Sequence, residues 1–178
     1  FVEFARKATE SVVISADDPG AIEITPRLSG HKVVTFGTNP AADVRIHSIE
    51  PGPTASFGLS WGGHELSATL RVPGHHNALN AAGAFGVLVS LGFEPAAALD
   101  ALCTFEGTGR RFELRGEVNG VRVFDDFAHH PTEIRAALSG ARAVVGDGRI
   151  ITIFQPHLYS RTRLLSAEFA TVLEELAE

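Results

Sequence analysis

Residues 121–133 read VRVFDDFAHHPTE, and this stretch sets the order of elements in the second half of the chain. The apolar residues up to Asp125 predict a β-strand, and Pro131 at a first helical position predicts a helix that runs to about Val145. Two carboxylates and two histidines fill the loop between them. Ligands bind at the carboxyl ends of strands in open α/β sheets, so this loop is a candidate functional site.

The loop allows three interpretations. Its carboxylates can accept hydrogen bonds from ribose hydroxyls, and its imidazoles can bind a substrate or shuttle protons. Asp and His are also ordinary ligands of divalent metals. Thr132 and Glu133 can instead belong to a helix cap in the first turn. So many polar groups in seven residues are unusual for a purely structural turn, which favours a functional role.

A second loop of this kind follows further along the chain. Residues 150–154 form a continuous apolar run, which predicts a strand buried in a parallel sheet, and Pro156 ends it. A last helix is expected after it. The order strand, helix, strand, helix predicts an open α/β sheet, so the loop FQPHLYSRTR of residues 154–163 opens on the same edge as the first loop. His157 and Arg161 are four residues apart and can face one pocket; a capped surface loop is the alternative.

The segment before residue 121 is expected to pair with the strand that starts there. Asn119-Gly120 is a strong turn signal, and it predicts a β-hairpin of strands 112–118 and 121–125. Glu106-Gly107-Thr108-Gly109, just upstream, is the predicted domain boundary. The expected domains are residues 1–106 and residues 107–178.

The first domain has the pattern of a mixed α/β fold. Strands are predicted over 12–14, 33–36, 43–49, 54–60 and 64–72, helices over 1–9, 77–91 and 95–102, and a turn over 17–20. The last three strands are separated by Pro51-Gly52-Pro53 and Gly62-Gly63, and they are expected to form an antiparallel meander. The helix that follows is apolar almost all round, which is typical of a buried helix.

Two polar motifs lie between that helix and the hairpin. Asn77 and Asn80 share one helix face, and their carboxamides offer the donor and acceptor that suit a purine edge. A helix cap with solvated neighbours is the alternative, and spacing alone favours it. Arg111, within GRRFE of residues 109–113, can reach phosphate oxygens through its planar guanidinium. A surface ion pair with Glu113 is the alternative there.

Composition narrows the class of protein. The 178 residues are 44% hydrophobic and 20% charged, as in an ordinary soluble globular protein. A formal net charge of −6 disfavours nucleic acid or an anionic membrane as the main partner, because both require basic surface. The single cysteine, Cys103, excludes an internal disulfide, and we interpret it as a small buried hydrophobe. No apolar run reaches the roughly 18 residues of a membrane helix, so no membrane insertion is expected.

The ends of the sequence predict an internal fragment of a longer protein. The chain begins at Phe1, contains no Met, and ends at Glu178 within a helical pattern that has no stop signal. It also contains no GxxxxGK[ST] loop for phosphate binding.

Taken together, the motifs resemble those of the Mur ligases. They are HNxxN at 76–80, GxxRRFE at 107–113, DDFAHHPTE at 125–133 and FQPHxYSRT at 154–162. The matching stretch runs from about Val72 to Thr162, and the segments at 17–19 and 35–37 extend the resemblance over nearly the whole chain. The form of the motifs is that of the branch that joins L-alanine to UDP-N-acetylmuramic acid.

The resemblance implies a nucleotide site in this chain. Asn77 and Asn80, with His76 beside them, match the positions that hold adenine. Arg111 matches the arginine at the domain junction that approaches the nucleotide phosphates. Asp126 matches the acid that binds the ATP ribose.

The resemblance also implies an amino-acid site and catalytic residues. His129 stands where sister ligases carry a functional lysine or histidine, and with Arg111 it forms the expected catalytic pair. His157 and Arg161 match positions around the incoming amino acid and its carboxylate. His129 is expected to contribute to substrate binding as well.

The implied protein is a cytoplasmic α/β enzyme of three domains that uses ATP and Mg²⁺ in peptidoglycan precursor synthesis. ATP phosphorylates the muramoyl carboxylate, the amine of L-alanine attacks the acyl phosphate, and phosphate leaves. This chain would hold the end of the central ATPase domain and the start of a Rossmann-like C-terminal domain. The phosphate loop, the magnesium ligands and the UDP-sugar domain would lie upstream of Phe1, so we expect no metal site and no ligase activity in the chain alone.

Two alternatives remain open. Phe127 replaces a frequent tyrosine and Leu158 a frequent arginine near the expected alanine pocket, and Phe127 is shared with the murein peptide ligase, a recycling enzyme. That enzyme diverges from Phe154 onward. A metal-dependent hydrolase is the second alternative, and it needs Asp125, Asp126, His129 and His130 to converge on a metal ion.

Overall fold

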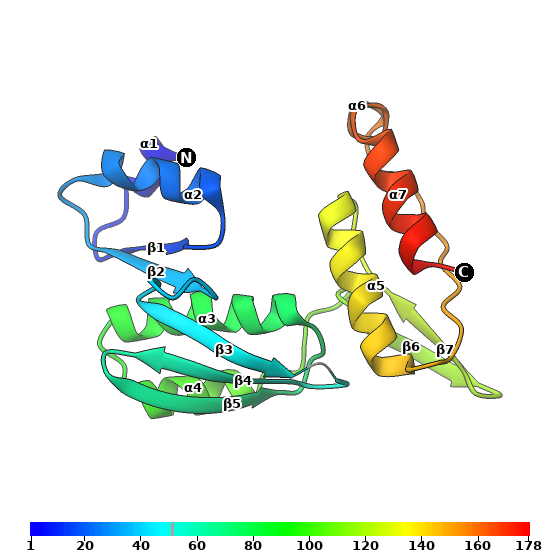
Figure 1. Cartoon of the computed structure of the whole chain (residues 1–178), viewed down its shortest axis with the longest axis horizontal. Helices are drawn as coiled ribbons and strands as arrows, with labels where there is room; N and C mark the ends of the chain where they lie inside the picture. Colours follow the sequence, from blue (N-terminus) through cyan, green and yellow to red (C-terminus); the bar gives the residue numbers. More distant parts are fainter. Residues whose placement is uncertain (51) are drawn as a thin grey trace.

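The computed structural model describes residues 1–50 and 52–178, which form two groups of elements (Figure 1). The first group consists of α1 (Val2–Ala5), β1 (Val12–Ser15), α2 (Pro19–Ile24), the 3₁₀ helix η1 (Thr25–Leu28), β2 (Val33–Gly37), β3 (Val44–Glu50), β4 (Ala55–Trp61), β5 (His64–Leu70), α3 (His75–Ser90) and α4 (Pro95–Cys103). The second consists of β6 (Glu113–Val118), β7 (Val121–Asp125), α5 (Pro131–Val145), α6 (Tyr159–Leu164) and α7 (Ser166–Leu176). The predicted break at 51–53 includes Pro51, which lies outside the described residues.

The first group is built on a mixed sheet in the order β1-β2-β3-β4-β5. β1 pairs parallel with β2 and β2 parallel with β3, whereas β3, β4 and β5 form an antiparallel meander. Ala55, Phe57 and Leu59 of β4 are buried and alternate with more exposed neighbours, as in a sheet with one covered face. The predicted meander and the mixed α/β class are confirmed.

Helix α3 covers that face of the sheet (Figure 1). Its Phe85 is fully buried and belongs to the same hydrophobic core as Val44 of β3 and Leu59 of β4. Close approach depends on a small residue at position 86, since a Cβ on Gly86 would lie 3.1 Å from a methyl of Val13. Helix α4 packs against α3 and β5. Among the described residues, no helix has the length and apolar character needed to cross a membrane.

The carboxyl ends of β1 and β2 are tied together by Asp17. Its carboxylate accepts the backbone N–H groups of Thr38 at 2.7 Å and Asn39 at 2.9 Å, and the Thr38 hydroxyl at 3.1 Å. Burial raises the pKa of Asp17, but these hydrogen bonds and the charge of His75 outweigh burial, so the pKa is lowered overall. The loops at this edge of the sheet are thereby held in one arrangement.

One helix at this edge was missed by the sequence analysis. Residues 17–20 were predicted as a turn, but Asp18 accepts the N–H of Ala21 at 2.7 Å and caps α2, which starts at Pro19. Pro at the first helical position fits a helix start as well as it fits a turn. The predicted helix over 1–9 is shorter than expected, since α1 covers only Val2–Ala5.

The second group consists of a hairpin and three helices. β6 and β7 pair antiparallel, and positive φ values of 51° at Asn119 and 78° at Gly120 confirm the predicted turn. Helix α5 packs on α7 through a small core of Ile134, Leu138, Phe169 and Val172.

The prediction of a strand over residues 150–154 is wrong in the described structure. The segment is not a strand, and the sheet of the second group contains only β6 and β7. Ile150 and Phe154 pack against the α5–α7 core, whereas Ile151 and Ile153 are 70% and 96% exposed. A strand requires a neighbour that exchanges backbone hydrogen bonds, and an apolar run in the sequence cannot say whether that neighbour is present.

We expect Phe85→Ala to destabilise the chain by about 3–5 kcal/mol, because it removes a fully buried ring from the centre of the core. Phe93→Ala is the matched control, since that ring is 57% exposed. Urea denaturation of the 178-residue chain measures both. Equal losses for the two variants would contradict the described core.

We expect Asp17→Asn to lower the free energy of unfolding at pH 7 by about 1 kcal/mol, because an ionised acceptor is lost from an exposed site. The pKa of Asp17 is lowered in the folded chain, so its contribution is present above the unfolded pKa near 4 and is lost as the pH falls. The difference from wild type should therefore shrink between pH 6 and pH 3. A difference that stays constant over this pH range would contradict the role of the Asp17 carboxylate.

Candidate active site

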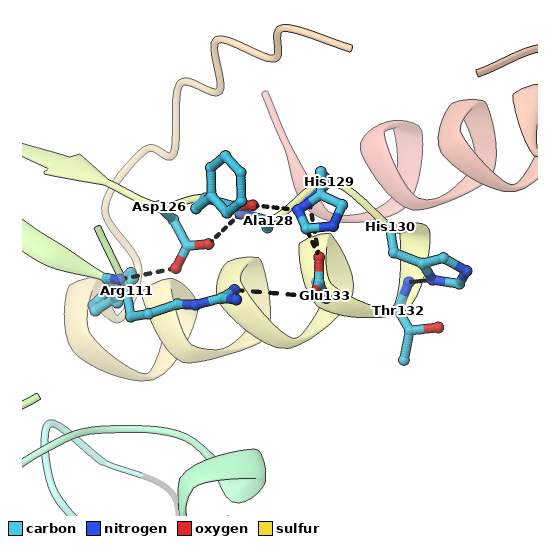
Figure 2. Close-up of polar contacts among 9 residues, drawn as sticks. Arg111, Asp126, Ala128, His129, His130, Thr132 and Glu133 are labelled. Carbon is cyan, nitrogen blue, oxygen red and sulfur yellow. Dashed lines mark hydrogen bonds and ion pairs between the residues drawn. The ribbon is translucent and has the colours of Figure 1, made fainter. Parts of the chain in front are cut away.

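Asp126 holds together the two segments that flank the hairpin. Its Oδ2 accepts the backbone N–H of Phe112 at 2.8 Å, and its Oδ1 accepts the backbone N–H of Ala128 at 2.6 Å (Figure 2). Phe112 immediately precedes β6, and Ala128 lies in the loop after β7. One half-buried carboxylate therefore fixes both the approach to β6 and the path toward α5.

The approach to β6 is conformationally strained. Arg110 and Phe112 have left-handed φ values of 58° and 49°, which are uncommon for residues with a side chain. The backbone N–H of Arg110 donates to Glu113 Oε2 at 2.8 Å, and that of Phe112 donates to Asp126. Arg111 therefore lies between two residues whose conformations are fixed by carboxylates.

Arg111 and His129 meet at the carboxylate of Glu133 (Figure 2). Arg111 Nη1 lies 3.9 Å from Oε1 of Glu133, whereas the backbone N–H of His129 donates to Oε2 at 2.9 Å. Burial raises the pKa of Glu133, but the His129 N–H, the charges of His129 and Arg111, and the His130 N–H outweigh burial and lower it overall. The Glu133 carboxylate is therefore ionised at neutral pH.

The ring of His129 is oriented through its Nδ1. This atom lies 2.8 Å from the carbonyl oxygen of Phe127, which can only accept, so we assign the proton to Nδ1 and leave Nε2 for other partners. The His129 ring centroid lies 4.9 Å from that of Phe127 and 5.9 Å from that of His157. The loop after β7 and the loop before α6 thus meet, although residues 150–154 form no strand.

The N-terminus of α3 approaches the same region. Gly74, the residue before the helix, has a φ of 98°, and a Cβ there would lie 2.7 Å from Cε1 of His76. Burial lowers the pKa of His76, the charges of His75 and Arg111 lower it further, and the carboxylate of Asp126 opposes them. The pKa of His76 is therefore lowered overall.

Three other predicted binding residues, Asn77, Asn80 and Arg161, lie outside this cluster of contacts. Asn77 Nδ2 donates to the carbonyl oxygen of Pro73 at 2.7 Å, and Asn80 is exposed on the next turn of α3. Arg161 lies in α6, and its Nη1 is buried without a hydrogen-bond partner among the described residues. Within the same residues, no hydrogen bond or ion pair joins these three side chains to Glu133.

The metal-hydrolase interpretation requires a cluster of side chains that can bind a metal ion together. In residues 1–50 and 52–178, no three His, Cys, Asp or Glu side chains are arranged to hold a metal ion. Both oxygens of Asp126 accept backbone N–H groups, and His130 Nδ1 accepts the N–H of Thr132 at 3.3 Å as the cap of α5.

The contacts of two residues at this site, Glu133 and Arg110, were not predicted. Glu133 was interpreted only as part of a helix cap, and its spacing in the sequence gives no sign of Arg111. Arg110 was assigned no role of its own, but its guanidinium lies 4.9 Å from the ring centroid of Phe127 and 3.4 Å from Asp125 Oδ2. Such contacts between separate segments depend on the fold of the hairpin.

Two family models match the chain. The model of the Mur ligase middle domain matches residues 1–88, and that of the Mur ligase glutamate ligase domain matches residues 110–178.

Relatives and solved structures give the same family. A UDP-N-acetylmuramate–L-alanine ligase of Clavibacter michiganensis is 60% identical over all 178 residues, which cover 37% of that relative. The crystal structure of the UDP-N-acetylmuramate-alanine ligase MurC from Thermotoga maritima has a TM-score of 0.78 at 33% identity, over 99% of this chain and 38% of that one. A murein peptide ligase from Psychrobacter arcticus has a TM-score of 0.62 at 28% identity, over 89% of this chain and 34% of that one.

The chain therefore spans well under half the length of these relatives. Both groups of elements carry a matching model of the same family, and the relatives at high identity extend across the link between them. The chain belongs to the Mur ligase family.

Proposed function

We propose that this chain is part of a longer ligase that joins L-alanine to UDP-N-acetylmuramic acid at the expense of ATP, in peptidoglycan precursor synthesis. The observation that carries the proposal is the 60% identity, along the entire chain, to a relative that bears this activity in its name. The clustering of Arg111, Asp126 and His129 around one loop supports it.

The nucleotide is proposed to bind between α3 and the loop after β7. Asn77, Asn80 and His76 would hold the adenine, and Asp126 would accept hydrogen bonds from the ribose. Each oxygen of Asp126 already accepts one backbone N–H, but a carboxylate has about four acceptor positions, so two remain for hydroxyl donors. Arg111 would approach the phosphates, for which its planar guanidinium is well suited.

The incoming amino acid is proposed to bind between the two loops. Arg161 would pair with its carboxylate, in keeping with the partnerless Nη1 of that side chain. His129 and His157 would line the same space, and Nε2 of His129 is the atom left to contact the attacking amine. The amine would then attack the carbonyl carbon of the muramoyl acyl phosphate, so that the amide bond forms as the bond from carbon to the phosphate oxygen breaks and inorganic phosphate leaves.

Magnesium is proposed to act with residues outside this chain. The ion would neutralise phosphate charge, and the described residues contain no group of ligands for it. The phosphate-binding loop is likewise proposed to lie upstream. We further propose a boundary between domains at residues 106 and 107, supported by separate cores before and after it, and a cytoplasmic location.

We expect the full-length protein to form ADP from ATP only when UDP-N-acetylmuramic acid and L-alanine are both present. Residues 1–178 alone should show no such activity, since they contain no phosphate loop. A coupled ADP assay measures both. Turnover with the murein tripeptide in place of L-alanine would identify the recycling ligase instead, the alternative that Phe127 raises.

We expect Asn80→Ala and Arg161→Lys to separate the two substrate sites in the full-length protein. Asn80→Ala should raise the KM for ATP by about 5- to 150-fold, the effect of losing one or two hydrogen bonds, and leave the KM for alanine nearly unchanged. Arg161→Lys keeps the charge but loses the planar fork, so it should raise the KM for alanine and spare that for ATP. Each variant is the control for the other, and a reversed pattern would refute the assignments.

A further inference from the structure

Glu133 contacts two proposed catalytic residues that come from different segments. Arg111 precedes β6, whereas His129 follows β7, and eighteen positions separate them in the sequence. The Arg111 guanidinium faces Oε1 at 3.9 Å (Figure 2). The His129 backbone N–H and Nδ1 face Oε2 at 2.9 Å and 3.5 Å.

A helix cap explains only half of this arrangement. Glu133 is the third residue of α5, whose cap is His130, and a Glu at that position commonly reaches back to a backbone N–H before the helix. The bond from the His129 N–H to Oε2 is a related contact, made one residue before the cap. The motif gives no reason for the second oxygen to face a guanidinium from another segment.

We propose that Glu133 is a positioning residue for the ligase reaction, which holds the Arg111 guanidinium and the His129 imidazole in register through the two oxygens of one carboxylate. The inference rests on the proposed function. Because a carboxylate is planar and rigid, a rotation of the Glu133 side chain moves both contacts together. The loop after β7 therefore cannot shift without altering the support of Arg111.

The contribution of Glu133 is geometric more than stabilising. The Arg111 and Glu133 side chains are 49% and 36% exposed, and ion pairs with that exposure contribute little to the free energy of folding. The contact also leaves much of the guanidinium free for phosphate oxygens. A fixed negative charge on one side of the guanidinium restricts its orientation without blocking it.

The test is Glu133→Gln in the full-length ligase. Gln keeps the length of the side chain and still accepts the His129 N–H, so α5 should remain capped and the melting temperature should stay close to wild type. Removing the charge should misplace the Arg111 guanidinium and weaken the contact with Nδ1 of the His129 imidazole, while the His129 backbone stays in place. The expected loss in kcat is about 10- to 100-fold, as for small misplacements of catalytic groups, and the KM values for ATP and alanine should change much less.

Glu94→Gln is the matched control. Glu94 also accepts a backbone N–H at the start of a helix, from Ala97 at 2.8 Å, but it lies at α4, away from the site. Its substitution should leave kcat unchanged. If Glu133→Gln leaves kcat unchanged, as Glu94→Gln should, then Glu133 is only a cap and the proposal is wrong.

A double-mutant cycle shows whether Glu133 acts through Arg111. In an Arg111→Gln background, Glu133→Gln should cost less than it does in the wild type, because one of its two targets is gone. Strictly multiplicative losses would overturn the proposal, even if Glu133→Gln alone proves unstable under assay conditions. If the wild-type protein shows no alanine-dependent turnover, the proposed function is wrong and this role is wrong with it. If the wild type is active and Glu133→Gln is equally active, only this role is wrong.

Discussion

The candidate site depends on the carboxylate of Asp126, which bonds the segment before β6 to the segment after β7. Those bonds hold Phe112 in a left-handed conformation, and Arg111 precedes it directly. They also fix the start of the loop that carries His129. Because both bonds are charge-assisted and partly shielded from water, they are stronger than bonds between neutral groups. The backbone N–H of Phe127, which donates to the carbonyl oxygen of Arg110 at 2.8 Å, joins the same two segments close by.

Helix α3 links the site to the core of the first group. Its apolar side packs on four strands of the sheet, and its first turn brings His76 toward Asp126 and Arg111. The core therefore fixes where the proposed nucleotide residues lie. Gly74 completes this arrangement, since only glycine readily adopts its φ and leaves room for the His76 ring. The asparagines of the same helix lie beside the buried Ala78 and Ala81, so the packing of α3 sets where they stand.

Local patterns predicted most of the elements. Helix α2 was not predicted because its local signal fits a turn equally well, and the other differences come from contacts between segments. The hairpin turn at Asn119-Gly120, the meander and the limits of α5 follow from signals within a few residues. The segment 150–154 looked like a buried strand because the sequence reports apolar character and not the presence of a partner. The contact of Glu133 with Arg111 could not be predicted for a related reason. In the sequence Glu133 is explained by a capping motif, and only the fold brings Arg111 beside it. The family motifs indicated which residues matter, but not which carboxylate joins them.

The topology of the mixed sheet also bears on the order in which the chain folds. β3 pairs with β4 and β4 with β5, each the next strand along the chain, so the meander forms from contacts that are near in sequence. The parallel pairing of β1 with β2 instead requires the intervening residues, including α2 and η1, to be ordered first. Closing that larger loop costs more chain entropy, and non-local pairing slows folding. Contact order therefore favours the meander as the folding nucleus, onto which α3, β1 and the loop tied by Asp17 assemble later.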